Sequence, residues 1–149
     1  MYQTLFPLFA GLSAALAIGT LAYLDQLIPG SLWLMAPFGA TTVLVFALPQ
    51  SLLAQPRNVI FGHLLAAAVG LVFVKFVGVY PWSLALATGL AITLMMLTKT
   101  VHPPAGANPV LIMLLNPGWE FLITPVLVGA VIIAAIGYLI NTVVAKKLQ

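Results

Sequence analysis

The stretch His102-Pro103-Pro104-Ala105-Gly106-Ala107 interrupts an apolar region with two prolines and a glycine, and Ala36-Pro37-Phe38-Gly39-Ala40 repeats this pattern earlier in the chain. Proline is favoured in the first turn of a helix, where its missing N–H costs nothing. Each stretch therefore predicts the start of a helix, over residues 37–48 and 104–115. A helix of that length rises about 18 Å, whereas a bilayer core is about 30 Å thick. We expect two half-helices.

The composition around these stretches is that of an integral membrane protein. The chain has 149 residues, of which 63% are hydrophobic and 5% are charged, and its formal net charge is +3. A soluble domain has about 25% charged residues. Five scattered cations cannot follow a phosphate backbone, which argues against a nucleic-acid partner. With no cysteine, two histidines and two carboxylates, we expect neither an enzyme nor a metal or other cofactor.

Apolar segments separated by polar or Pro/Gly-containing stretches predict the number of crossings. A span needs about 20 apolar residues, and the sequence offers six helical segments, of which the second and fifth are short and Pro-broken. No basic residue precedes the first apolar run, so we interpret it as a span and not as a cleaved signal peptide. The segments are residues 5–24, 32–49, 58–79, 82–98, 101–116 and 121–142.

The few charged residues predict the orientation. With six crossings, four cations fall at one face of the membrane, and the positive-inside rule places that face in the cytoplasm. Two acidic residues, Asp25 and Glu120, are expected as loop charges at the other face, while Lys75 is expected to snorkel to the headgroups. This predicts a multi-pass protein of the plasma membrane (the bacterial inner membrane) with both termini cytoplasmic. The four cations are Arg57, Lys99, Lys146 and Lys147.

Aromatic residues give the same sidedness. Membrane proteins carry Trp and Tyr in belts at the membrane interfaces. Five such residues fall at expected outer ends of spans, so we predict that they form an interfacial belt: Tyr23, Trp33, Tyr80, Trp82 and Trp119.

The chain also matches itself at an offset of 67 residues. The informative identities are one proline and three glycines, since Val, Leu and Ala also coincide by chance. Each copy holds three crossings, an odd number, so the copies must have opposite orientation, as in many transporters. We predict one transmembrane domain over 1–149, all-α, built of two inverted three-helix repeats (1–80 and 81–149). The informative pairs are Pro37/Pro104, Gly39/Gly106, Gly62/Gly129 and Gly70/Gly137.

Small residues recur at helical spacing within several spans. Such stripes let helix backbones approach closely in lipid, which serves either packing within one subunit or an oligomer interface. Because six short helices enclose little space, we expect a homo-oligomer, a dimer or a trimer. The stripes are Gly11, Ala15 and Gly19; Gly62, Ala66 and Gly70; and Ala85 and Gly89.

The two half-helix starts form the candidate site. Free N–H groups and the positive end of the helix dipole favour an anion, and two such ends related by a pseudo-two-fold axis would make one central anion site. Thr41 and Asn108 occupy equivalent repeat positions and offer hydrogen-bond donors. The alternative is a pair of interfacial loops in which proline only starts each helix. The candidate substrate-binding residues are Pro37, Phe38, Gly39, Ala40, Thr41, His102, Pro103, Pro104, Ala105, Gly106, Ala107 and Asn108.

Four further residues are candidates for gating or electrostatic roles. His63 is either a satisfied intramembrane histidine or a substrate contact, and Arg57 and Asn58 stand at the expected cytoplasmic mouth. Lys99 lies close to the motif and can attract anions or only set the topology. His102 is either a proton carrier coupled to anion entry or an interfacial histidine, since histidine titrates near neutrality. Two histidines alone lack the ligands for a metal site.

These motifs, together with Gln55-Pro56-Arg57-Asn58 and Gly62-His63, resemble the HPP family of integral membrane proteins, which is named for its His-Pro-Pro tripeptide. The resemblance covers residues 5–142. It implies a membrane transporter, with nitrite as substrate for members in cyanobacteria and plastids. The family is usually described with four spans, fewer than the six predicted here. The residues themselves indicate only a small anion, and together with the resemblance we predict a transporter or channel for a small monovalent oxyanion, with nitrite as the candidate. The rival is a non-transporting membrane assembly or regulatory subunit.

Overall fold

The structure, a computed structural model, describes residues 2–28 and 32–146, and within these ranges the chain forms six helical segments. The first is α1 (Tyr2–Leu27). The second begins with α2 (Ala36–Thr42) and continues as a π-helical turn, η1 (Val43–Ala47). A short 3-10 turn, η2 (Leu52–Ala54), follows η1. The third and fourth are α3 (Pro56–Phe76) and α4 (Pro81–Leu97). The fifth is a 3-10 turn, η3 (Pro103–Ala107), that leads into α5 (Asn108–Leu115), and the sixth is η4 (Trp119–Leu122), η5 (Ile123–Leu127) and α6 (Val128–Lys146).

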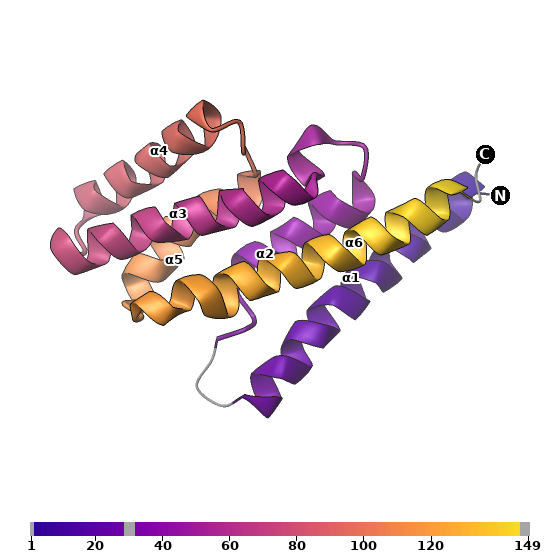
Figure 1. Cartoon of the computed structure of the whole chain (residues 1–149), viewed down its shortest axis with the longest axis horizontal. Coiled ribbons are helices and arrows are strands. Elements are labelled where there is room, and N and C mark those ends of the chain that lie inside the picture. Colours follow the sequence, from indigo (N-terminus) through magenta and orange to yellow (C-terminus); the bar gives the residue numbers. More distant parts are fainter. Residues whose placement is uncertain (1, 29–31, 147–149) are drawn as a thin grey trace.

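Helix length divides the bundle into two classes. Leu5–Leu27, Pro56–Phe76 and Trp119–Thr142 are long and apolar enough to cross a membrane, while Ala36–Ala47 and Pro103–Leu115 belong to the shorter apolar helices. The prediction of an all-α, polytopic chain with six segments and two short Pro-broken helices is therefore confirmed. In Figure 1, α1 begins and α6 ends at the same end of the bundle.

The second segment begins later than the apolar pattern predicts. The expected segment starts at residue 32, but the chain reaches Met35 in extended conformation (φ −91°, ψ 135°) and the helix starts at Ala36. Pro37 explains the difference, because proline disfavours helical backbone at the residue before it and suits the first helical turn. The fifth segment starts in the same way, with His102 extended before Pro103.

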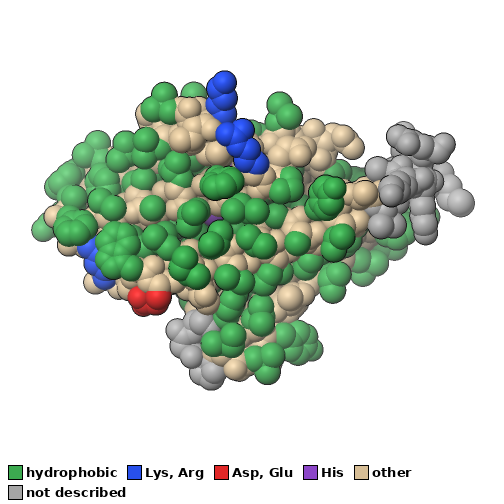
Figure 2. All heavy atoms as spheres, viewed as in Figure 1, with side chains coloured by type: hydrophobic (Ala, Val, Ile, Leu, Met, Phe, Trp, Pro, Cys, Tyr) green, Lys and Arg blue, Asp and Glu red, His purple; other side chains and the backbone are tan. Residues whose placement is uncertain are grey.

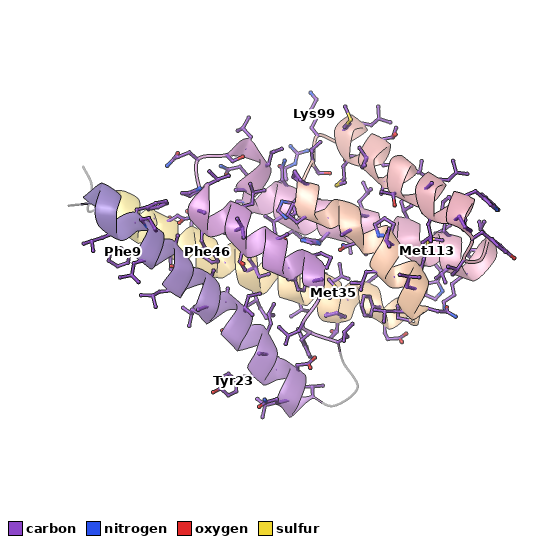
Figure 3. All side chains as sticks on the ribbon, turned by 180° about the vertical axis from the view of Figure 1, so that it is seen from behind. Phe9, Tyr23, Met35, Phe46, Lys99 and Met113 are labelled. Atoms are coloured by element: carbon purple, nitrogen blue, oxygen red, sulfur yellow. The ribbon has the colours of Figure 1, made fainter. Side chains whose placement is uncertain are left out.

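Hydrophobic side chains cover most of the surface, as expected of a chain surrounded by lipid. Figure 2 shows a surface on which hydrophobic side chains predominate and charged ones are few. On α1, Leu8, Leu12 and Leu16 are each more than half exposed, and Phe9 lies on the outer side of the same helix in Figure 3. A soluble protein rarely exposes an apolar patch of this extent.

Glycines allow each short helix to pack closely against a long one. A Cβ added at Gly62 would lie 2.8 Å from the His102 Cβ, and one added at Gly70 would lie 2.9 Å from the Pro109 Cα. These contacts hold the η3–α5 segment against α3. Close backbone approach through small residues is how helices associate in lipid.

The same arrangement occurs 67 residues away. A Cβ added at Gly129 would overlap the Phe38 ring, and one added at Gly137 would overlap the Val45 side chain. These contacts hold α2 and η1 against α6. Ile112, which also lies against Gly70, is the repeat counterpart of Val45. The pair of Gly70 and Ile112 thus recurs as Gly137 and Val45 with the offset of the sequence repeat. The other glycine contacts differ, because Gly62 meets His102 and Gly129 meets Phe38. The division at residue 80 stays a prediction.

The stripes of small residues serve two different purposes. Gly62 and Gly70 are buried inside the subunit, whereas no heavy atom beyond their own helix and chain neighbours lies within 4 Å of the added Cβ at Gly11, Gly19 or Gly89. The α3 stripe therefore packs the bundle, and the stripes on α1 and α4 face outward.

The expected aromatic belt is wrong for one of its five residues and stays a prediction for the other four, which are exposed. Tyr23, Tyr80, Trp82 and Trp119 are about half exposed or more, but Trp33 is 4% exposed and belongs to the hydrophobic core. The Trp33 backbone N–H donates to the Asp25 carboxylate (2.8 Å). Asp25 lies within α1, so it is a structural acceptor and not a loop charge as predicted.

Candidate functional site

Four polar side chains meet in the interior of the bundle. Thr41 comes from α2, His63 from α3, His102 from the extended residue before η3, and Asn108 from the first residue of α5. Each has zero exposed surface. We call these four residues the central polar cluster. Polar groups inside a membrane bundle are costly and are usually tied to function.

The Thr41 hydroxyl is the centre of this cluster. Its oxygen lies 2.8 Å from the His63 Nε2, 3.0 Å from the His102 Nε2 and 2.9 Å from the Pro37 carbonyl oxygen. The rings of the two histidines are 5.0 Å apart between centroids. Thr41 can bridge both histidines because it lies one helical turn after Pro37, on the buried side of α2.

Two backbone carbonyls fix the protonation sites of the histidines. The His102 Nδ1 lies 2.8 Å from the Leu53 carbonyl, which only accepts hydrogen bonds, so His102 carries its hydrogen on Nδ1. The Asn108 Nδ2 lies 3.0 Å from the His63 carbonyl, which fixes it as the NH₂ group. It also lies 3.0 Å from the His63 Nδ1. His63 therefore accepts at Nδ1 and donates from Nε2 to Thr41.

One acceptor in the cluster has no partner. Among the buried side-chain atoms of the described residues, only the Asn108 Oδ1 and the Trp33 Nε1 make no hydrogen bond. An unpaired buried polar atom costs about 1–3 kcal/mol. The Asn108 Oδ1 of the central polar cluster is therefore an acceptor that lacks a hydrogen-bond donor.

The two helix starts also line a shared groove on the outside of the bundle, with a volume of about 540 Å³. Pro37 and Ala40 stand on one side of it, and their repeat counterparts Pro104 and Ala107 stand on the other. Thr41 and Asn108 follow Ala40 and Ala107 directly in the chain, but they do not line the groove. Ala40 and Ala107 therefore stand between the groove and the central polar cluster. Its lining comprises Ala36, Pro37, Ala40, Val43, Leu44, Leu48, Pro103, Pro104 and Ala107.

The predicted substrate-binding residues thus divide between two surroundings. Thr41, His102 and Asn108 are in the cluster, and the Phe38 ring packs edge-on against the His63 ring at 5.1 Å between centroids. Gly39 is exposed, and a Cβ added there or at Gly106 would meet nothing within 4 Å. Both glycines face open space beside the groove.

The first free amides after the prolines are already in use. The Phe38 N–H donates to the Met35 carbonyl (2.9 Å) and the Ala105 N–H to the His102 carbonyl (3.0 Å). Ala105 itself is fully buried. The expectation of several unpaired amides at each helix start is wrong for these two, because each start forms a tight turn that bonds its own backbone.

His63 and His102 are both enclosed by protein. His63 is buried and hydrogen-bonded on both ring nitrogens, as expected of a satisfied intramembrane histidine. His102 is fully buried as well, and its role as a proton carrier stays a prediction. The tight turn into Pro103 directs its ring inward, against Gly62.

The residues expected at the mouth lie outside the cluster. The Asn58 Nδ2 donates to the Val101 carbonyl (2.9 Å) and the exposed Arg57 donates to the Thr98 carbonyl (3.3 Å), so both tie α3 to the segment before η3. Lys99 is exposed and projects outward (Figure 3), in a left-handed conformation (φ 56°). Lys75 donates to the Asn116 side chain (2.9 Å). The side chains of Lys146 and Lys147 lie outside the described residues.

Sequence reasoning missed the Leu53 carbonyl. This acceptor orients His102 from the loop between α2 and α3. A backbone acceptor has no side-chain signature, so only the fold reveals it.

The fold and this site define a class: a polytopic helical membrane protein in which two broken helices enclose a buried polar cluster. The transmembrane region of the HPP family matches residues 3–148, and the chain belongs to that family.

Two curated relatives are transmembrane proteins of Dictyostelium discoideum. One is 34% identical over 147 residues, which cover 93% of this chain and 51% of the relative, and the other is 33% identical over 126 residues, which cover 78% and 40%. The chain thus spans about half or less of the length of these relatives. No solved structure matches the chain.

Proposed function

We propose that this chain moves a small monovalent oxyanion across the membrane, with nitrite as the candidate substrate and no catalytic chemistry. The observation that carries the proposal is the central polar cluster, four fully buried polar side chains at the place where two broken helices begin. Broken helices at membrane depth are tolerated where they line a path or are buried in protein, and transporters place their substrate sites there.

The helix starts support an anionic substrate. The first residues of both segments, including Pro37 and Pro104, line the same groove, so the positive ends of two helix dipoles lie close together there. No buried Asp or Glu is present among the described residues to repel an anion. The Thr41 hydroxyl and the Asn108 amide offer hydrogen bonds at equivalent repeat positions.

The surroundings of the protein belong to the same proposal. We place the chain in the plasma membrane, the bacterial inner membrane, with both termini cytoplasmic. We also propose a homo-oligomer, because the outward stripe with Gly11 and Gly19 and the groove beside Gly39 leave small residues uncovered in one subunit. Small residues at a helix surface favour association in lipid.

Uptake of nitrite into proteoliposomes of the purified chain tests the transport proposal. Asn108→Leu keeps the volume and removes the amide, so it is expected to lower protein-dependent uptake about tenfold or more, which corresponds to the 1–3 kcal/mol of a lost buried hydrogen bond. Asn141→Leu is the matched control, because Asn141 also donates to a backbone carbonyl (Val45, 3.1 Å) but outside the cluster. Uptake equal to that of protein-free vesicles would instead favour a non-transporting subunit.

A further inference from the structure

A groove with one charged end runs along the first turns of α3 and opens to the outside of the bundle. It has a volume of about 370 Å³. Its lining on α3 recurs at helical spacing, so these residues share one face of the helix. They are Arg57, Phe61, Leu64, Leu65 and Ala68. Arg57 is exposed and the other four are apolar, so a cation stands at one end of the groove and hydrocarbon lines the rest of α3.

The remaining polar groups of the groove stand at the same end as Arg57. Thr98, the residue that follows α4, and Thr100 complete the lining. The Arg57 guanidinium donates to the Thr98 carbonyl (3.3 Å), and the hydroxyl oxygens of Thr98 and Thr100 lie 2.8 Å apart. The groove is therefore divided along its length, with hydrogen-bonding groups at the start of α3 and apolar side chains beyond them.

The turn after α4 adds a second cation. The Thr98 carbonyl belongs to the peptide bond with Lys99, so Arg57 and Lys99 project from neighbouring points. Lys99 is exposed and left-handed (φ 56°), in a turn that the Thr100 N–H closes by donating to the Met95 carbonyl (2.8 Å). Glycine usually occupies this position, because it has no Cβ. Figure 2 shows basic side chains grouped over this turn, among hydrophobic ones.

No carboxylate balances these two cations. Among the described residues, Arg57 bonds the Thr98 carbonyl and no acidic group. The chain has two acidic residues, of which Asp25 accepts from the Trp33 N–H and Glu120 lies in η4. The charged end of the groove is therefore complementary to an anion from outside the subunit.

The length of the groove matches one leaflet of a bilayer. From Arg57 to Ala68 the helix rises about 16 Å, and half of a bilayer core of about 30 Å is about 15 Å. Arg57 is the second residue of α3, which is long and apolar enough to cross a membrane. With the cations at the membrane surface, the apolar part of the groove extends to about the middle of the bilayer.

We propose that this groove binds one acyl chain of an anionic phospholipid and that Arg57 and Lys99 hold the lipid phosphate. Basic groups at grooves between membrane helices recognise anionic headgroups. A guanidinium suits a phosphate, because its N–H groups form parallel hydrogen bonds with two oxygens. The proposal does not depend on which substrate the chain transports.

A second copy of the chain does not supply the missing charge. Its Asp25 is bonded within its own subunit. Its Glu120 follows Asn116, which accepts from Lys75 in the last turn of α3, so in a copy of the same orientation Glu120 lies at the membrane face opposite the two cations. A phospholipid carries a phosphate and a hydrocarbon chain in the order that the groove requires.

Lipid binding to the purified chain in neutral detergent tests the proposal. Native mass spectrometry counts the bound lipid and gives its affinity for phosphatidylglycerol, which is anionic, and for phosphatidylcholine with the same acyl chains, which is zwitterionic. We expect one tightly bound phosphatidylglycerol per chain, with an affinity about fivefold or more above that of phosphatidylcholine, the contribution of one cation near a membrane surface. Equal affinities would overturn the proposal, and so would equal binding of inorganic phosphate, which has no acyl chain.

Three variants test the charged end. Arg57→Gln is expected to weaken phosphatidylglycerol binding about fivefold. Lys75→Gln, the control with the same change of charge at the other end of α3, should leave it unchanged, and equal losses would show attraction to net charge alone and overturn the proposal. Lys99→Gly removes the second cation and relieves the left-handed backbone. We expect weaker phosphatidylglycerol binding with an unchanged or raised melting temperature, whereas unchanged lipid binding would contradict the role of Lys99.

Ala68→Phe tests the apolar end, because it fills the groove and leaves both cations in place. It is expected to weaken phosphatidylglycerol binding at least as much as Arg57→Gln does. Ala85→Phe is the control, since Ala85 is an exposed alanine of α4 outside the groove. Unchanged binding by Ala68→Phe would overturn the proposal, as would a lipid-independent dimer that this variant abolishes. The comparison of the two lipids uses the unmodified chain, so it holds even where a variant does not fold.

Discussion

Two pairs of packed segments, η3–α5 on α3 and α2–η1 on α6, agree in their packing and differ in their chemistry. In both, a short helix starts at a proline and lies against a long helix at two glycines, Gly62 and Gly70 in one and Gly129 and Gly137 in the other. The polar residues do not follow this rule. His63 corresponds to Ala130 and His102 to Met35, so both histidines of the central polar cluster belong to one set of positions.

The difference separates what the fold needs from what the site needs. Close packing is required wherever a short helix meets a long one, so it recurs in both pairs of packed segments. A buried histidine is costly in either pair, and two histidines at the centre are sufficient for a shared site. Only Thr41 and Asn108 contribute to the site from equivalent positions, and they differ in chemical type.

The largest expected effect is at the glycine contacts. Gly70→Ala places a Cβ 2.9 Å from the Pro109 Cα, a backbone atom that cannot rotate away, and Gly137→Ala places a Cβ in overlap with the buried Val45 side chain, which is β-branched and stiff at χ1. Overpacking costs about 1–3 kcal/mol, and we expect both variants at the upper end of this range. Thermal unfolding in detergent measures both. Gly11→Ala is the control, because nothing surrounds that position, and equal losses at all three would refute the packing argument.

An intermediate effect is expected within the central polar cluster. His63→Leu removes the ring nitrogen that accepts from the Asn108 amide and the ring N–H that donates to the Thr41 hydroxyl. The free energy of unfolding should therefore fall by about 2 kcal/mol. Adding Asn108→Leu replaces the second polar group with an apolar one. The double variant is expected to recover part of the stability while nitrite uptake stays lost.

A double variant no more stable than His63→Leu alone would show that the two side chains contribute independently. Chemical denaturation of the three variants in parallel, analysed as a double-mutant cycle, decides this point.

The smallest expected effect is at the segment between α4 and η3. Asn58→Ala removes the hydrogen bond to the Val101 carbonyl. Hydrogen bonds between helices in membranes contribute about 0.6 kcal/mol on average, and we expect a loss of about that size. The repeat counterpart of Asn58 is Pro125. Proline has no side-chain amide, so the effect is expected at Asn58 and not at its counterpart. Amide hydrogen exchange measures the effect. We expect exchange to become faster at residues 98–101 and to stay unchanged in α1. An equal change along the whole chain would contradict this prediction.

Composition and proline position predict the fold of this chain well. Apolar length gives the six segments, because lipid permits few alternatives to a helix. Pro37 and Pro104 also indicate where the short helices begin, since proline acts on the backbone next to it. Trp33 is the failure: an aromatic residue close to a helix end fits the membrane interface and the core equally well in sequence, and only the fold shows that Trp33 is buried and bonded to Asp25.

The candidate site is predicted less completely. Thr41, His102 and Asn108 follow from the repeat and the motif, but their convergence on His63 depends on how three helices cross. The Leu53 carbonyl and the partners of the Phe38 and Ala105 amides are backbone features, and side-chain identity does not encode them. Arg57 and Lys99 look like site residues in sequence because they lie close to the motifs along the chain. Proximity along the chain does not determine which way a side chain points.

The unequal distribution of the histidines has one more consequence. A protein of two identical inverted halves would look the same from either side of the bilayer and would work equally well in both directions. Here the hydrogen-bonded chain runs from Asn108 through His63, Thr41 and His102 to Leu53, in the loop that joins α2 to α3. Met35, the repeat counterpart of His102, has no ring nitrogen to extend a matching chain. The two imidazoles thus make the two sides of the site chemically different.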